Sequence, residues 1–102
     1  MIARIWHGIL KRKSDTDEFA DYVMQTGVKG VQATEGNRGV YVLKHVDEER
    51  AEFLFISLWD SFDAIHRFAG EDMEKAVYHP KDKEFLLELE PKVKHFEVLV
   101  KP

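Results

Sequence analysis

The chain has 102 residues, 44% hydrophobic and 33% charged, which is ordinary for one globular domain, and we expect a single domain over residues 1–102. Its net charge of −4 argues against nucleic acid as a partner, and the absence of cysteine excludes disulfides, thiolate nucleophiles and cysteine-ligated zinc. The first ten residues, interrupted by Arg4 and His7, are too short for a signal peptide or a membrane span. We therefore expect a cytoplasmic protein that does not bind membranes.

The first half of the chain predicts a strand, a helix and a loop. Ile2 to Leu10 is rich in β-branched and aromatic residues and indicates a strand. Ser14 to Gly27 indicates a helix, because it has capping residues at its start, a glycine at its end and apolar residues at helical spacing between them. Val28 to Gly39 is rich in glycine and asparagine, which favours a loop.

The second half predicts a hairpin, a helix and a last strand. Val40 to Val46 and Phe53 to Trp59 are strand-like runs on either side of a charged turn. A helix capped by Asp60 or Ser61 follows and is broken by Gly70. A short second turn before Pro80, another helical turn in residues 81–91 and a strand over residues 93–100 complete the chain.

The order of these elements predicts the fold class. Four strands with two long crossovers, in the order β-α-β-β-α-β, are typical of a ferredoxin-like α+β sandwich with an antiparallel sheet and helices on one face. Both faces of the sheet look apolar, since residues such as Leu54 and Ile56 alternate with Phe53 and Phe55. A monomer would expose one of these faces, so we expect a homodimer joined sheet to sheet, with Trp6 at the interface.

Several segments resemble the antibiotic biosynthesis monooxygenase superfamily across nearly the whole chain. They are RIWHG, GNRGVYVL, FISLWDSFDAI, FAGEDMEKAVYHP and PKVKHFEVLV. The resemblance implies a dimeric α/β barrel with a ligand cavity between the helices and the sheet of each subunit. It also implies activities that range from cofactor-independent oxidation of aromatic polyketides and quinols to haem degradation.

The residues that the haem degraders use are not kept in this chain. Their catalytic asparagine aligns with His7, their helix tryptophan with Phe68 and their haem-ligating histidine with Tyr78. His79 stands one residue later and could still reach iron. The resemblance therefore favours a reaction without cofactor and leaves haem as the less favoured option.

Three residues are the candidates for catalysis: His7, Tyr78 and His79. His7 lies among apolar residues of the first strand, as either a core histidine or a base at the cavity floor. Tyr78 could hydrogen-bond a substrate or pack under a loop, and His79 precedes Pro80, which restricts it to extended conformations.

Four further residues are candidates for the cavity wall. His95 could approach His7 across neighbouring strands, Phe68 and Met24 could be lining or core, and Trp59 is more simply a packing anchor. Arg38 could meet an anionic substrate, although an exposed turn arginine is commoner. No ligand spacing for a metal, nucleotide motif or Ser-His-Asp pattern is present.

These features lead to three hypotheses about function. The first is cofactor-independent oxidation of an aromatic or quinol-type compound by a small homodimer. The second is non-catalytic binding of a small aromatic ligand. The third is a haem-binding or haem-degrading protein that uses His79 or His7.

Overall fold

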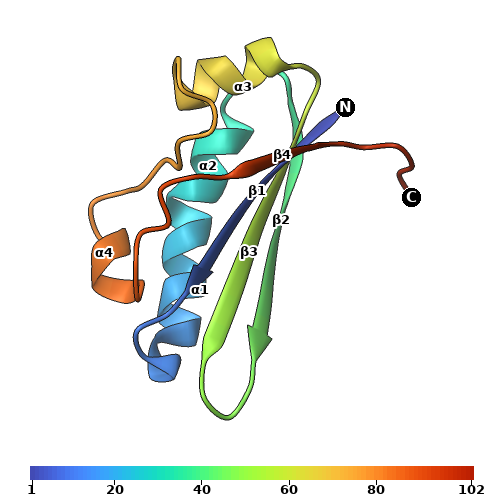
Figure 1. Ribbon diagram of the computed structural model, residues 1–102. Helices are drawn as coiled ribbons and strands as arrows, with labels where there is room; N and C mark the ends of the chain where they lie inside the picture. The colour runs from blue at the N-terminus through green and yellow to red at the C-terminus, as the bar shows by residue number, and fades with distance from the viewer.

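The computed structural model describes all 102 residues, and its elements follow the predicted order. Four antiparallel strands form one sheet in the order β2-β3-β1-β4, and helices cover one of its faces (Figure 1). The predicted ferredoxin-like α+β fold is therefore confirmed. The elements are β1 (Ile2–Ile9), η1 (a 3-10 turn, Lys13–Asp15), α1 (Thr16–Gln25), α2 (Gly27–Gln32), β2 (Asn37–Val46), β3 (Ala51–Trp59), α3 (Phe62–Ala69), α4 (Asp82–Phe85) and β4 (Lys94–Glu97).

The register of β1 decides which of its side chains face the helices. Ile2 pairs with Trp59 and Ile9 pairs with Glu52, while the first half of β1 also pairs with β4. Because side chains alternate along a strand, Arg4 and Trp6 point towards the helices and their neighbours point away. The face turned away from the helices is called the outer face here; it carries Ile5, His7, Tyr41, Leu43, Leu54, Ile56 and Phe96.

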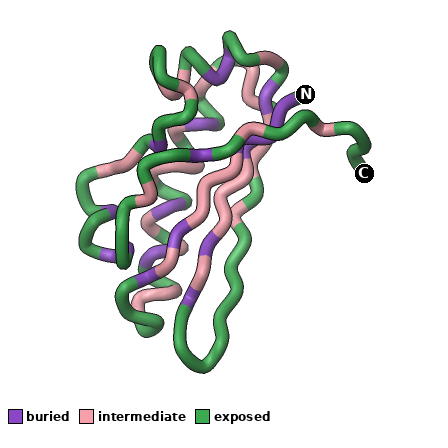
Figure 2. Tube along the Cα trace, in the orientation of Figure 1, coloured by how far each residue is buried: buried purple, intermediate pink, exposed green.

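Two apolar clusters fill the layer between the helices and the sheet, where Figure 2 shows most of the buried chain. One cluster centres on Phe19 and Phe53, whose rings meet edge to face at 5.0 Å. The other surrounds Trp59 and includes Val31 and Ile65, all three fully buried. The two clusters hold opposite ends of the helical layer on the sheet, and the space between them forms the pocket described below.

The predicted loop over residues 28–39 is wrong in its first part, because α2 occupies Gly27–Gln32. Val31 of this helix is fully buried in the cluster around Trp59, and that burial offsets a helix penalty of about 1 kcal/mol for each glycine. Gly27 also allows close approach to the sheet, because a Cβ atom there would lie 3.2 Å from the ring of Phe55. Composition indicated a loop here, and tertiary packing overrides it.

The remaining boundaries differ from prediction at two places. Between Gly70 and Pro80 the predicted short turn is limited to one, closed by the Lys75 N–H and the Asp72 carbonyl at 3.2 Å, and the rest is irregular apart from an isolated bridge from Lys75 to Lys92. The last strand ends at Glu97, and Leu99 beyond it is 86% exposed because no neighbouring strand pairs with it. The predicted cap of α3 is confirmed for Ser61, whose hydroxyl accepts the Ala64 N–H at 3.2 Å.

No helix of the chain combines the length and the apolar character needed to cross a membrane.

Candidate functional site: a pocket between helices and sheet

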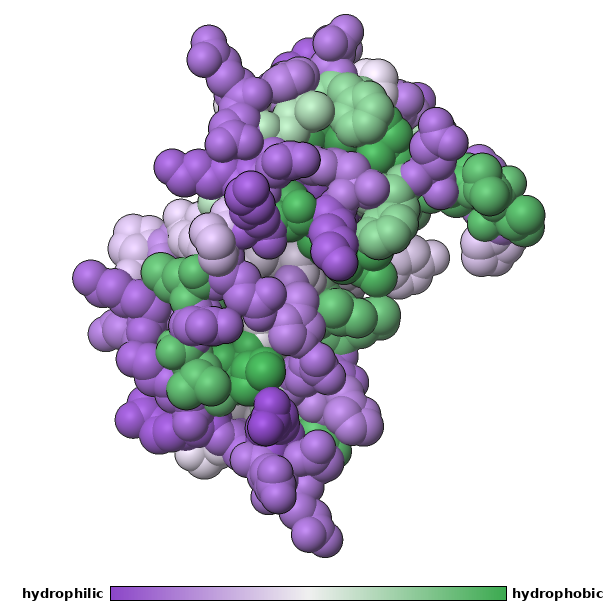
Figure 3. Space-filling model, in the orientation of Figure 1, coloured by the Kyte–Doolittle hydropathy of each residue, from purple (hydrophilic) through white to green (hydrophobic).

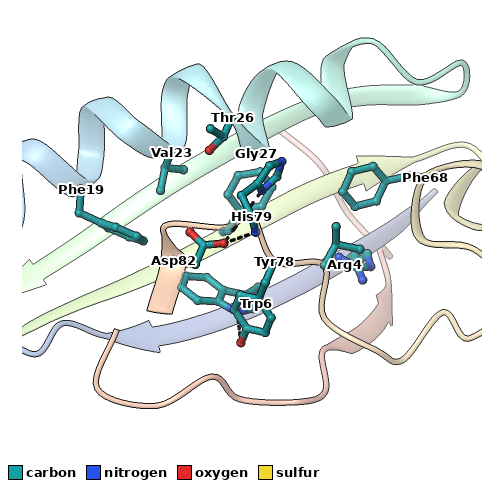
Figure 4. Close-up of a pocket in the computed structure, with 12 residues that line it drawn as sticks. Arg4, Trp6, Phe19, Val23, Thr26, Gly27, Phe68, Tyr78, His79 and Asp82 are labelled. Carbon is teal, nitrogen blue, oxygen red and sulfur yellow. Dashed lines mark hydrogen bonds and ion pairs between the residues drawn. The ribbon is translucent and has the colours of Figure 1, made fainter. Parts of the chain in front are cut away.

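A pocket lies between the helical layer and the helix-facing side of the sheet (Figure 4). Its cavity volume is about 60 Å³. The empty space rises to about 500 Å³ when the open solvent at its mouth is included. The free pocket is thus a narrow slot, and most of the residues that line it are hydrophobic. Its walls are Arg4, Trp6, Phe19, Val23, Thr26, Gly27, Phe55, Phe68, Val77, Tyr78, His79 and Asp82.

The floor of the pocket is a hydrogen-bonded pair of aromatic residues. The indole of Trp6 donates to the hydroxyl of Tyr78 at 3.0 Å, and that hydroxyl donates to the carbonyl of Glu90 at 2.5 Å. Burial raises the pKa of Tyr78, and the charges of nearby carboxylates raise it further. The hydrogen bond from Trp6 acts in the opposite direction. A tyrosine hydroxyl has one hydrogen to donate, and that of Tyr78 is already donated to the Glu90 carbonyl, so Tyr78 cannot also donate to a ligand.

His79 and Asp82 form the polar part of the pocket wall. The carboxylate of Asp82 accepts the backbone N–H of His79 at 2.6 Å, and its oxygen lies 4.0 Å from the imidazole Nδ1. Burial raises the pKa of Asp82, and the hydrogen bond and charge of His79 oppose that rise. The imidazole of His79 is one-third exposed and has no hydrogen-bond partner within the chain, so it is free to contact a ligand.

Arg4 lies beside Phe68, at the end of the pocket away from Phe19 and Val23 (Figure 4). Its guanidinium carbon stands 5.4 Å from the centre of the Phe68 ring, and its Nη2 donates to the carbonyl of Lys75 at 2.9 Å. Its Nε is fully buried without a partner. Burial lowers the pKa of Arg4 to about 10, and no carboxylate pairs with it.

His7 does not line the pocket, contrary to the expectation that it forms the cavity floor. It lies on the outer face between two carboxylates, with Nδ1 at 2.6 Å from Glu90 and Nε2 at 2.5 Å from Glu52. Ionised carboxylates only accept hydrogen bonds, so both ring nitrogens must carry protons. Burial by itself would lower the pKa of His7, but the hydrogen bonds and charges of the two glutamates raise it overall.

Trp6 is also on the other face from the one expected, since it lies in the pocket and not on the outer face. The two misplacements have one cause. Both faces of β1 carry apolar residues, so alternation identified two sets of side chains without showing which set meets the helices. The structure thus brings Tyr78 together with Trp6, and separates it from His7 by the thickness of the sheet.

The predicted wall residues divide into lining, core and surface. Phe68 lines the pocket. Trp59 is fully buried, donates to the Ser57 hydroxyl at 2.8 Å and packs on Phe68. It is therefore a packing anchor, which was the simpler of the two interpretations, and does not line the pocket. Met24 is 48% exposed and does not line the pocket.

His95 is separated from His7 because the two histidines point to opposite faces of the sheet. It lies opposite Arg4 in the β1–β4 register, and its Nε2 is fully buried without a hydrogen-bond partner. Arg38 does not line the pocket. Its guanidinium forms an exposed ion pair with Asp60 at 2.6 Å.

Arg4, Asp82 and Phe55 line the pocket although the sequence patterns did not indicate them. Arg4 had a usable signal, since it alternates with Ile2 and Trp6 and an arginine on an apolar strand face must be buried with them. Asp82 had none, because its burial depends on how α4, which it begins, packs against α1. No group of three histidine, aspartate or glutamate side chains is arranged to hold a metal ion.

Comparison with known proteins adds a likeness of fold. No family model matches the chain, and no curated protein sequence matches it. Among solved structures it is similar to a crystal structure of a mutant of MhuD with two manganese protoporphyrin IX molecules bound per active site. The two chains align with a TM-score of 0.65 over 100% of this chain and 98% of that one, at 17% identity. The protein therefore has the ferredoxin-like fold of MhuD.

Proposed function

We propose that the protein binds a small planar aromatic compound in the pocket and oxidises it with molecular oxygen, without a cofactor. The observation that carries the proposal is the imidazole of His79, which has no hydrogen-bond partner and stands 4.0 Å from an Asp82 oxygen, on the wall of a narrow slot lined by aromatic rings. A pocket lined by aromatic side chains favours aromatic ligands, and imidazole is the side chain that most often acts as general base.

The chemistry needs only groups that the chain and oxygen supply. His79 takes a proton from a phenol, an enol or an activated ring CH₂, and Asp82 favours the resulting imidazolium. The carbanion form of the substrate then transfers electrons to oxygen and forms a carbon–oxygen bond. For an anthrone, the CH₂ group and O₂ become a carbonyl group and water, so atoms and electrons balance.

Oxygen uptake with a panel of quinols and anthrones tests this proposal. We expect uptake with at least one compound, and a fall of about 10²- to 10⁴-fold in His79→Ala, the usual contribution of a general base. His45→Ala is the matched control, because His45 is exposed and lies outside the pocket. Ligand-dependent thermal stabilisation without uptake would instead support a non-catalytic binding protein.

Haem binding is the second candidate, and two observations favour it. MhuD, whose fold the chain shares, binds manganese protoporphyrin IX, and His79 offers this pocket a nitrogen ligand for iron. The donor fits haem, but the space does not: a porphyrin is larger than a three-ring aromatic compound, and the walls of this small pocket would have to move further apart to admit it. We therefore assign no step to haem, and haemin titration, with a Soret shift lost in His79→Ala, tests its binding.

We also propose that two copies of the chain associate through their outer faces. Tyr41, Leu43 and Phe96 on this face are each 45–53% exposed, more apolar surface than a monomeric sheet usually leaves in water. Leu99 and Val100 add further exposed apolar surface on the C-terminal tail. The tail projects from the body of the molecule (Figure 1) and forms a hydrophobic patch of its own in Figure 3. A two-fold interface between identical sheets would cover this surface.

A further inference from the structure

The pocket holds a positive charge that nothing in the chain neutralises. Arg4 is only 5% exposed, yet no aspartate or glutamate forms an ion pair with it. One of its nitrogens is bonded to the Lys75 carbonyl, and Nε is buried without any partner. A buried charge without a counter-ion is strongly unfavourable, and proteins generally pair such groups.

The surroundings of Arg4 add a second unsatisfied group. His95 faces Arg4 across the β1–β4 pair, and its Nε2 is also fully buried without a partner. Burial lowers the pKa of His95, and the charge of Arg4 lowers it further against the opposing effect of Glu74. Arg4 therefore brings a buried N–H group without an acceptor to one end of the pocket, and His95, which does not line the pocket, places a second unpartnered nitrogen on the neighbouring strand.

We infer that this end of the pocket binds the carboxylate of the ligand, so that the ligand is an aromatic carboxylate. This rests on the proposed function, since it assumes that an aromatic ligand occupies the slot. A guanidinium donates to a carboxylate through two parallel N–H groups, a stronger contact than one with a neutral acceptor. The ring of such a ligand lies along Phe68, Trp6 and His79, and its carboxylate meets Arg4.

Phe68 prepares Arg4 for this contact. The Phe68 ring stands 5.4 Å from the guanidinium carbon, and the Lys75 carbonyl accepts from Nη2, so the group is oriented before the ligand arrives. A fixed donor loses little conformational entropy on binding, which favours affinity.

Binding of two matched probes, anthraquinone-2-carboxylate and its neutral carboxamide, tests the inference by calorimetry. We expect the wild type to bind the carboxylate about 10- to 100-fold more tightly, which is the worth of a charge-assisted hydrogen bond. Arg4→Met should remove that preference and still bind the carboxamide. Arg38→Met, which removes an arginine outside the pocket, should keep the preference.

The outcomes separate the two claims. Equal affinity of the wild type for both probes overturns the carboxylate inference and leaves the proposed aromatic pocket standing. Binding of neither probe overturns both. If Arg4→Met does not fold, Arg4→Lys replaces it: a lysine keeps the charge but cannot make the two-pronged contact, so a reduced preference supports the inference and an unchanged one contradicts it.

Discussion

The indole of Trp6 and the hydroxyl of Tyr78 are joined by a hydrogen bond of 3.0 Å that closes one wall of the pocket. The Tyr78 hydroxyl donates a hydrogen bond to the carbonyl of Glu90, whose carboxylate accepts one from His7 on the outer face. Trp6 and His7, adjacent in β1 but on opposite faces of the sheet, are thus both linked to Glu90, Trp6 through Tyr78 and His7 directly. This arrangement fixes the irregular segment before β4 against the sheet, and with it the shape of the pocket.

Replacing Tyr78 with phenylalanine should destabilise the protein by about 1–3 kcal/mol, because the Trp6 N–H and the Glu90 carbonyl lose their partner in a partly buried site. Urea unfolding measures the change. Tyr41→Phe is the control, since that hydroxyl lies on an exposed ring and makes no hydrogen bond within the chain. Equal stability of the two variants would show that the Trp6–Tyr78–Glu90 chain contributes nothing.

His7 should make stability depend on pH. Its pKa in the folded protein is raised above the ordinary value of 6.5, so its contribution is fully present below pH 6.5 and is lost as the pH rises through the folded pKa. The contribution is about 1 kcal/mol, because the side chain is one-third exposed and solvent screens the ion pairs.

The difference in unfolding free energy between the wild type and His7→Gln isolates this effect from the other titrating groups. Measured at constant protein concentration, it should shrink between pH 6 and pH 9. A difference that stays constant over this range would contradict the ion pairs with Glu52 and Glu90.

Gly36→Ala should cost markedly more stability than Gly39→Ala. Both glycines have positive φ, 93° and 133°, so both alanines are strained by roughly 1 kcal/mol or more. A Cβ at Gly36 would also lie 2.4 Å from the Cβ of Ala64, whereas a Cβ at Gly39 meets nothing within 4 Å. This overlap adds about 1–3 kcal/mol, and thermal unfolding of both variants measures the difference. Equal losses would mean that α3 does not pack on the turn as described.

Leu43→Glu should convert the proposed dimer to a monomer, because it sets two like charges in an apolar interface. Light scattering at micromolar concentration measures the mass, and circular dichroism checks that the fold is kept. Met24→Glu is the control, because Met24 is 48% exposed and belongs to α1, on the helical side of the sheet. A wild type that is already monomeric would contradict the proposed association.

The strands and the fold class were predictable, because period-two patterns and turn residues are local properties of the chain. The orientation of β1 was not, since Trp6 and His7 each have apolar neighbours on their own face. Only the register with β3 and the position of the helices decide that Trp6 enters the pocket.

The pocket itself was predictable in part. Phe68, Tyr78 and His79 line it as expected. The role of α2 was hidden by its two glycines, because helix propensity gave no sign that Val31 would be buried against Trp59. Asp82, the first residue of α4, accepts the backbone N–H of His79 three residues before it, a contact that no apolar periodicity reveals.

The most direct test of the central claim, that an aromatic ligand binds between the helices and the sheet, is an NMR titration of the ¹⁵N-labelled protein with anthraquinone-2-carboxylate. The claim predicts that the indole N–H signal of Trp6 and the signals of Gly27 and His79 shift most, while Tyr41 and Leu43 on the outer face stay in place. Shifts confined to the outer face, or no shifts at saturating ligand, would contradict it.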